Sequence, residues 1–293
     1  MRKQVATLAK DNQKLETLLT DPDFQPGGSP QASAQAAQLS QQLAAARARI
    51  EVLEAKKIPY TAEELALFKV PRISLPPPPK MAKASAKPAA AASPSGDAPA
   101  ASRNASAPAA TGLLVAEAQR AFGERRFTEA EAKYAAALNL DERSVFTLSN
   151  LAATQLEQNK LPEAEATLKR ALSADANDPY SLSLLGLLKF RQEKYDEALD
   201  SLSRAAQLDP KNAQTQNYLG MALAQKAQRP AAETAFRKAV QLSPNYGEAH
   251  FNLAVFYSSQ QPPSKELAKW HYQRALSAGL GRSADLEKVM NQE

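Results

Sequence analysis

A block of apolar and charged residues recurs along the second half of the chain every 34 residues, and this periodicity constrains the fold more than any other feature. The block reads LPEAEATLKRAL over 161–172 and YDEALDSLSRAA over 195–206. Related blocks occupy 127–138 and 229–240. A fixed period of this length is typical of stacked supersecondary units, because one such unit cannot bury its apolar face alone.

Small and large apolar residues hold fixed places within each period. The first small residue of each block is followed four positions later by a large one, giving the pairs Ala130 and Tyr134, Ala164 and Leu168, Ala198 and Leu202, Ala232 and Phe236. The segment before each block carries a second small residue, at Ala152, Gly186, Gly220 and Ala254. Small residues let two helices approach closely, and large neighbours fill the groove between them. The pattern therefore predicts paired helices.

This arrangement resembles the tetratricopeptide-repeat (TPR) family. The resemblance implies an all-α fold, a helical-hairpin superhelix of about five repeats over 111–282, followed by a capping helix over 283–293. We place the repeats at 111–144, 145–178, 179–212, 213–246 and 247–282.

The fit to the repeat pattern weakens at both ends. Glu117 stands where the family has leucine, and the last repeat gains two residues in its turn, around 262–263. We expect Ser283 to cap the final helix, whose apolar face would consist of Leu286, Val289 and Met290. Such departures are common in terminal repeats.

The first 57 residues carry two heptad stripes and predict two short coiled-coil or amphipathic helices, within 1–20 and 34–57. The first stripe is Val5, Leu8, Asn12, Leu15 and Leu19, and the second is Ala36, Leu39, Leu43, Ala46, Ile50 and Leu53. Two arrangements satisfy these stripes. They fold back as a hairpin, or they pair with other copies to give a homo-oligomer through residues 1–57, and the sequence leaves both open.

Between these helices and the repeats lie a short motif and a linker. Thr61 and Glu64 form a capping box, which predicts a helical motif over 58–70. Residues 71–110 are rich in Pro, Ala, Ser and Lys and have too little large apolar surface to fold, so we predict a disordered linker. The linker is long enough for the motif to dock in the chain's own binding groove; the alternative is a short cap on the coiled coil.

Charge and composition exclude several classes of partner. Up to residue 110 the chain has 14 Lys/Arg and 9 Asp/Glu, and beyond it 22 of each, so the repeats are neutral and a poor match for a phosphate backbone. We therefore expect no nucleic-acid partner. No apolar run approaches the ~20 residues of a membrane helix, so we expect no direct membrane insertion. The default compartment is the cytoplasm, or the periplasm if an upstream signal segment is missing.

The residues that enzymes need are scarce. The chain has no cysteine, which removes disulfides, thiolate zinc sites and cysteine nucleophiles. His250 and His271 are the two histidines, and neither has a neighbouring ligand set in the sequence. No glycine-rich phosphate loop or Ser/His/Asp arrangement is evident. We predict a chain that is not an enzyme and that binds no metal and no cofactor.

The resemblance implies that the concave face, lined by the first helix of each repeat, binds a protein or peptide partner. Carried over by position, the candidate residues are Phe146, Ser149, Asn150, Tyr180, Leu184, Leu187, Asn217, Tyr218, Met221, Phe251, Asn252 and Val255. Asn150 and Asn252 match the place where family members hold a ligand's backbone amide. Val115 and Gln119 stand where a carboxylate clamp would need cations, so we expect an apolar or amphipathic segment instead.

These features favour a scaffold or adaptor for protein–protein interaction. The alternative is a structural component of a bacterial cell-envelope assembly, oligomerised through the N-terminal coiled coil. The order of coiled coil, spacer and repeats is similar to that of periplasmic cell-envelope coordinators.

Overall fold

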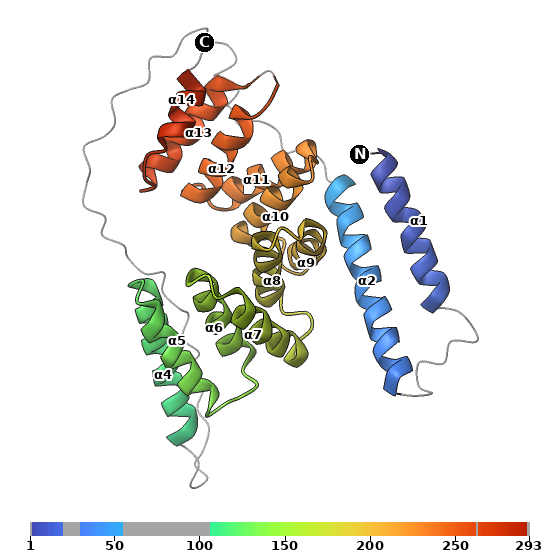
Figure 1. Cartoon of the computed structure of the whole chain (residues 1–293), viewed down its shortest axis with the longest axis vertical. Helices are drawn as coiled ribbons and strands as arrows, with labels where there is room; N and C mark the ends of the chain where they lie inside the picture. Colours follow the sequence, from blue (N-terminus) through green and yellow to red (C-terminus); the bar gives the residue numbers. More distant parts are fainter. Residues whose placement is uncertain (1, 20–29, 55–105, 262, 292–293) are drawn as a thin grey trace.

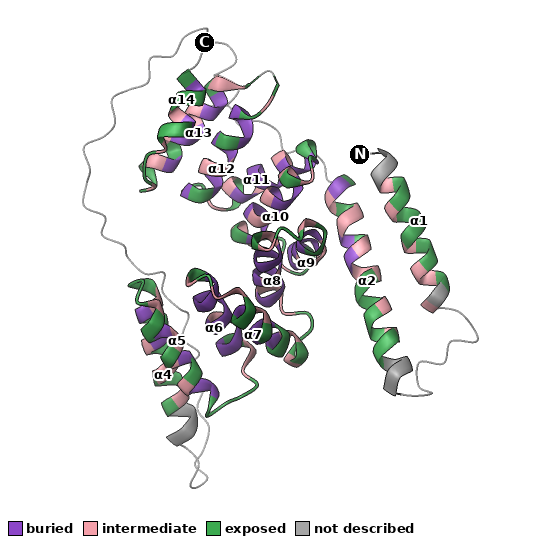
Figure 2. Ribbon diagram, viewed as in Figure 1, coloured by how far each residue is buried: buried purple, intermediate pink, exposed green. Residues whose placement is uncertain are grey.

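The computed structural model of the chain describes residues 2–19, 30–54, 106–261 and 263–291 (Figure 1). All regular secondary structure in these segments is helical, and the predicted TPR-type superhelix is confirmed. The motif predicted over 58–70 and residues 71–105 of the linker predicted over 71–110 lie outside the described residues. The linker prediction is wrong for 106–110, which form the start of the first repeat helix. Buried residues concentrate along the stacked hairpins between α5 and α13 (Figure 2).

Ten helices form five consecutive hairpins, each with a first and a second helix. The hairpins are α4 (Ser106–Gly123) with α5 (Phe127–Leu138), α6 (Val145–Glu157) with α7 (Leu161–Ala174), α8 (Pro179–Arg191) with α9 (Tyr195–Leu208), α10 (Ala213–Gln225) with α11 (Arg229–Leu242), and α12 (Gly247–Ser258) with α13 (Lys265–Ser277). The first helix of the first hairpin begins at Ser106, earlier than the expected start at Thr111. Pro108 lies in its first turn, where a missing backbone N–H costs nothing.

Side-chain caps start three of the first helices. Ser144, Asp178 and Asn212 each accept a hydrogen bond from the backbone N–H three residues later, at 3.3, 2.7 and 3.0 Å. Such a cap satisfies one of the amides that a helix start leaves without a partner inside the helix. The caps recur every 34 residues, so these three repeats start their first helices in the same register.

The turns inside four hairpins share one backbone conformation. Arg125, Asn159, Glu193 and Ala227 have φ of 60°, 58°, 60° and 54°. This left-handed region favours glycine, so non-glycine residues there cost some stability. Because the same conformation recurs at the same place, we infer that the tight turn is imposed by packing of the two helices on either side of it.

Close helix approach within a hairpin depends on the small residues of the repeat. A Cβ placed on Gly186 would lie 2.3 Å from Leu202 Cγ, and one on Gly220 would lie 2.6 Å from Phe236 Cδ1. Both distances are far below van der Waals contact. The large residue of the second helix therefore occupies the space that a side chain on the first helix would need.

Hydrogen bonds and ion pairs between polar side chains join successive repeats. Gln192, which directly follows α8, and Lys189 of α8 donate to the Glu165 carboxylate of α7, at 3.0 and 3.2 Å. These bonds and Lys169, with the Gln192 bond contributing most, lower the pKa of Glu165 to about 2. One repeat earlier, Gln158 donates in the same way to Glu131 at 2.8 Å.

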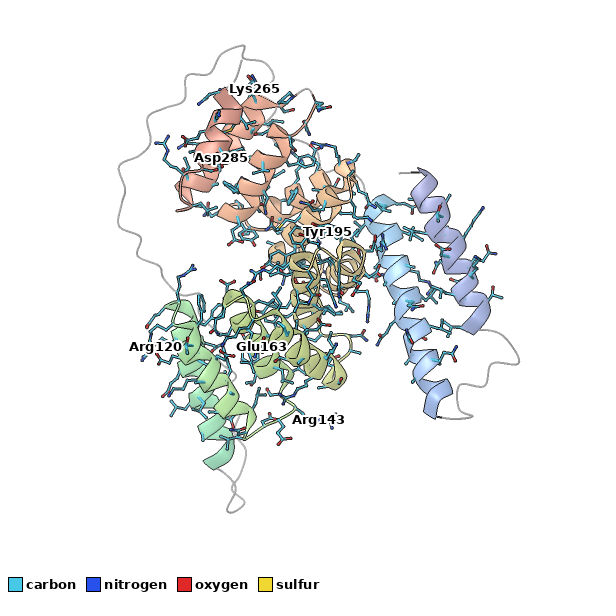
Figure 3. The ribbon with its side chains drawn as sticks, in the orientation of Figure 1. Arg120, Arg143, Glu163, Tyr195, Lys265 and Asp285 are labelled. Atoms are coloured by element: carbon cyan, nitrogen blue, oxygen red, sulfur yellow. The ribbon has the colours of Figure 1, made fainter. Side chains whose placement is uncertain are left out.

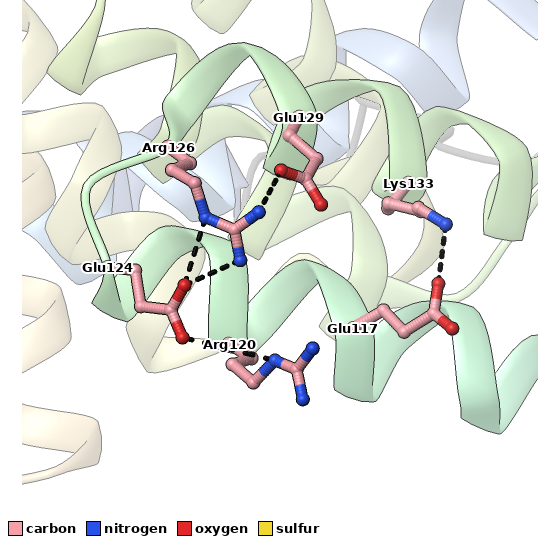
Figure 4. A network of polar contacts seen from close by, with 6 residues as sticks. All are labelled: Glu117, Arg120, Glu124, Arg126, Glu129 and Lys133. Carbon is pink, nitrogen blue, oxygen red and sulfur yellow. Dashed lines mark hydrogen bonds and ion pairs between the residues drawn. The ribbon is translucent and has the colours of Figure 1, made fainter.

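Ion pairs on the first hairpin explain its departure from the repeat pattern (Figure 4). Glu117, which stands where the family has leucine, pairs with Lys133 across α4 and α5 at 2.5 Å. Arg126 contacts both Glu124 and Glu129 at the turn. These groups are well exposed, and exposed pairs typically contribute under ~1 kcal/mol each. Glu117 is therefore accommodated at this position by its ion pair with Lys133 of the second helix.

The two N-terminal helices form an antiparallel hairpin, so the structure has the first of the two arrangements that the stripes allow. The helices are α1 (Arg2–Leu19) and α2 (Pro30–Glu54), joined by an ion pair of 2.7 Å between Arg47 and Glu16 (Figure 1). α2 also packs against α9, a contact that sequence analysis did not predict. Arg49 reaches Asp200 at 3.1 Å and Asp196 at 3.5 Å on that helix.

The last helix, α14 (Ala284–Asn291), packs on α12 and α13. Ser283 caps it by accepting the Leu286 N–H at 3.4 Å, as expected. Leu286 and Met290 are buried, whereas Val289 is 45% exposed and does not belong to the apolar face. Leu286 and Met290 are about one turn apart and belong to the core cluster of the preceding hairpin.

We predict that Gly220→Ala destabilises the chain by about 1–2 kcal/mol. The new methyl group must displace the Phe236 ring, at a typical cost of ~1–3 kcal/mol, and the gain in helix propensity of up to ~1 kcal/mol offsets only part of it. Gly112→Ala in α4 is the matched control, because a Cβ there meets nothing within 4 Å. Urea unfolding followed by circular dichroism measures both, and an equal effect of the two changes would contradict the packing argument.

We predict that Glu165 makes unfolding free energy depend on pH below about 5. The folded pKa of about 2 lies below the unfolded value of ~4.3, so the stabilisation is present above that value and is lost as pH falls. Glu165→Gln should cost of the order of 2 kcal/mol at pH 7 and roughly half of that at pH 3. Glu163→Gln, on an exposed neighbour of the same helix (Figure 3), should change stability equally little at both pH values.

Candidate functional site on the concave face

The first helices of the repeats pack side by side and form one face of the stack. α6 neighbours α8, α8 neighbours α10, and α10 neighbours α12. The second helices α7, α9 and α11 pack behind them. Every residue predicted to bind a partner lies on α6, α8, α10 or α12.

Part of the predicted set is buried between neighbouring first helices. Ser149 donates to the Val145 carbonyl oxygen at 2.7 Å, and its hydroxyl lies 2.7 Å from that of Ser181 on α8. Leu184, Leu187 and Asn217 are also buried. These four residues shape the face from beneath, and a bound partner would meet little of their surface.

A chain of amide and hydroxyl bonds crosses from α10 to α12. Asn252 donates from Nδ2 to Asn217 Oδ1 at 2.9 Å, and Asn217 donates to the Tyr246 hydroxyl at 3.4 Å. Tyr246 in turn donates to the Glu248 carboxylate at 3.2 Å. Asn150 instead donates to the Phe146 carbonyl oxygen of its own helix at 2.8 Å. The two asparagines that match one family position are therefore bonded differently.

The accessible part of the face is apolar and aromatic. Phe146 is 54% exposed and Val255 is 43% exposed. Tyr180, Tyr218, Met221 and Phe251 are half-buried. Sequence analysis had assigned all six to the binding face, and the structure brings them to one side of the stack.

The tyrosine hydroxyls on this face stay neutral near pH 7. Burial, and after it the Glu248 carboxylate, raises the pKa of Tyr218 and Tyr246 well above the usual range. Burial likewise raises the pKa of Tyr180. The Tyr218 hydroxyl accepts a bond from Gln214 at 2.7 Å and keeps its own proton to donate. Such hydroxyls can bond to the backbone of a bound segment.

A pocket of about 290 Å³ opens where α8, α10 and α12 meet the start of α11. Met221, Asn252 and Val255, all predicted site residues, line it. Sequence analysis missed its other lining residues, which are Phe190, Ala224, Gln225, Arg229, Phe236, Phe256 and Ser259. One sequence signal could have indicated the pocket. Ala224 is small, whereas the matching positions of the three preceding repeats carry large residues.

The two histidines are close together in space. Their Nδ1 atoms lie 2.9 Å apart in the core of the last hairpin, and His250 Nε2 is 3.0 Å from the Pro244 carbonyl oxygen. Sequence analysis treated them as separate, because they are 21 residues apart in the chain and only the packing of α12 on α13 brings them together. Within the described segments, no group of three or more His, Asp or Glu side chains has the arrangement of a metal site.

None of the described helices combines the length and the hydropathy that crossing a membrane requires.

Comparison with known proteins identifies the repeats. Two family models described as tetratricopeptide repeat match residues 121–188 and 183–247. No curated protein matches the sequence. Among solved structures, the chain is similar to Pseudomonas aeruginosa pilF, with 20% identity and a TM-score of 0.54 over 63% of this chain and 82% of that one.

A second similar structure is the APC/C hetero-tetramer Cut9–Hcn1, with 20% identity and a TM-score of 0.57. The match covers 63% of this chain and only 36% of that chain. At this level of identity, both similarities concern the fold alone.

We predict that Asn217→Ala destabilises the chain by about 1–3 kcal/mol, because it removes a buried side chain and leaves half-buried bonding groups of Asn252 and Tyr246 without this partner. Asn150→Ala is the control. Its side chain bonds only within α6, so its loss should cost under ~0.5 kcal/mol. Chemical unfolding of the two variants measures the difference, and similar losses would show that the α10–α12 bond is not a structural tie.

Proposed function

On the premise that residues 121–247 are tetratricopeptide repeats, a module that binds proteins, we propose that this chain is a non-catalytic scaffold whose concave face binds another polypeptide. The ligand in this proposal is an apolar or amphipathic segment. The observation that carries it is the accessible apolar surface on the first helices, formed by the exposed Phe146 and Val255 and the half-buried Tyr180 and Tyr218. Exposed apolar surface that is gathered on one face commonly marks an interaction site.

Hydrogen bonding supports the same choice of ligand. The face offers neutral tyrosine hydroxyls and amides, which suit the backbone of a bound segment. Val115 and Gln119 occupy the places of the cations in a carboxylate clamp, so we do not propose that mode of binding on the first repeat.

The alternative, a structural component of a cell-envelope assembly, requires the N-terminal stripes to pair between copies. Here α1 and α2 pair within one chain, and α2 packs on α9. The scaffold is therefore the function that the arrangement supports best.

We predict that peptides selected from a random displayed library against the full chain are rich in aliphatic and aromatic residues. Binding to the variant Tyr218→Ala/Val255→Ala should be at least about tenfold weaker, because each truncated anchor contributes ~1 kcal/mol or more and 1.4 kcal/mol corresponds to a factor of ten.

The control variant is Leu140→Ala/Leu208→Ala, which removes two exposed leucines at the ends of second helices. It should bind the selected peptides as the unmodified chain does. If both variants lose binding equally, or neither does, the concave face is not the binding surface.

A further inference from the structure

We infer that the fourth repeat carries a subsite for the partner, in which a large apolar side chain enters the pocket beside Ala224 and an adjacent carboxylate pairs with Arg229. This inference rests on the proposed function and names the chemistry of the segment that the concave face takes.

The first three repeats fill this place with their own side chains, whereas the fifth has Ser258 at the position that matches Ala224. In the first repeat, the rings of Phe122 and Phe127 pack edge to face with centroids 5.5 Å apart. In the third, Phe190 and Tyr195 (Figure 3) pack in the same way at 5.6 Å. The second repeat has Leu156 and Leu161 at the matching positions. The pair joins the end of the first helix to the start of the second.

The fourth repeat lacks this pair. Ala224 and Arg229 occupy the two positions, so neither a ring nor a branched aliphatic chain fills the space. The pocket of about 290 Å³ lies there, and both residues line it. Its walls include the rings of Phe190, Phe236 and Phe256. A large apolar side chain from another polypeptide would restore the contacts that the siblings make internally.

Arg229 is held in place at this pocket. Its Nη2 donates to the Ser259 carbonyl oxygen at 2.7 Å and to the Ser259 hydroxyl at 3.1 Å. Its guanidinium carbon lies 5.3 Å from the centroid of the Phe256 ring. Across the described segments, no carboxylate lies within ion-pair distance of Arg229. A guanidinium has five N–H donors, so this one keeps donors for a carboxylate brought by the partner.

The residues around the pocket determine where the partner's carboxylate would lie. Arg229 lines the pocket and also a neighbouring cavity of about 730 Å³, at the turn between α12 and α13. A segment that leaves the pocket in this direction passes the guanidinium. The neighbouring cavity contains one carboxylate of the chain itself, Glu233, which accepts the Tyr257 hydroxyl at 3.0 Å. The favourable place for an anion is therefore beside Arg229, next to the apolar side chain.

The carboxylate has two sources, an Asp or Glu side chain and the C-terminus of the partner. Both present the same planar pair of oxygens to a guanidinium. The test therefore uses synthetic peptides from the selection against the full chain, each prepared with Asp/Glu replaced by the amide and, separately, with an amidated C-terminus.

The first test variant is Ala224→Phe/Arg229→Tyr, which restores the pairing of the third repeat and fills the pocket. We expect it to unfold at the same or a higher temperature and to bind the selected peptides at least tenfold more weakly. Arg229→Gln is the second variant. It leaves the pocket open, and it keeps the test valid if the filled variant does not fold.

The peptides should carry an aromatic or large aliphatic residue within two positions of an acidic residue or of the C-terminus. Loss of the responsible carboxylate should weaken binding to the unmodified chain about tenfold and leave binding to Arg229→Gln unchanged. If replacing Asp/Glu by the amide causes this loss, the carboxylate is a side chain. If amidating the C-terminus causes it, the carboxylate is the C-terminus of the partner.

Two results would overturn the inference. In the first, peptides depend on Tyr218 and Val255 but bind the filled variant and Arg229→Gln normally. This result would refute the subsite and leave the proposed function intact. A selection that yields no peptide dependent on Tyr218 and Val255 would refute both.

Discussion

The close approach of the two helices in each hairpin is the contact on which the rest of the structure depends. Where Gly186 meets Leu202, and where Gly220 meets Phe236, no space remains for even a methyl group. This contact fixes the distance and angle between the helices, because ridges of one must fit grooves of the other. The buried cluster then continues from α9 through α13, so the geometry of one hairpin sets the position of the next. The concave face follows from packing at its back.

Positions where the sequence departs from the repeat pattern form surfaces that the regular positions do not. Side chains at the regular positions pack between helices, so they do not also serve to bind a partner. Ala224 and Arg229 leave a pocket where the first three repeats have a pair of large side chains. On the third repeat, Leu199 replaces the glutamate found at the matching place in the second, and the same helix pairs Asp196 and Asp200 with Arg49 of α2. The first departure coincides with the pocket, and the second lies on the helix that contacts α2.

Polar residues on the concave side have a structural task that limits their use in recognition. A buried amide costs free energy unless its donors and acceptors are bonded. Asn217 meets this condition through Asn252 and Tyr246 and thereby ties α10 to α12. Asn252 has thus already used a donor that the family pattern assigns to a ligand. The exposed aromatic and aliphatic side chains, which carry no such obligation, are the groups left to meet a partner.

The sequence by itself determined the helices, their pairing and the face that the first helices share, because a 34-residue period with fixed small and large residues admits one kind of packing. It also placed Phe146, Tyr218 and Val255 on that face. Only the tertiary structure decided which predicted residues are buried, that α2 packs on α9, and that His250 touches His271. These contacts join residues far apart in the chain, and a repeat pattern describes neighbours within one period. The pocket beside Ala224 needed both the sequence and the tertiary structure. The sequence shows that a large side chain is missing at this position, but the space it leaves exists only because three hairpins pack together.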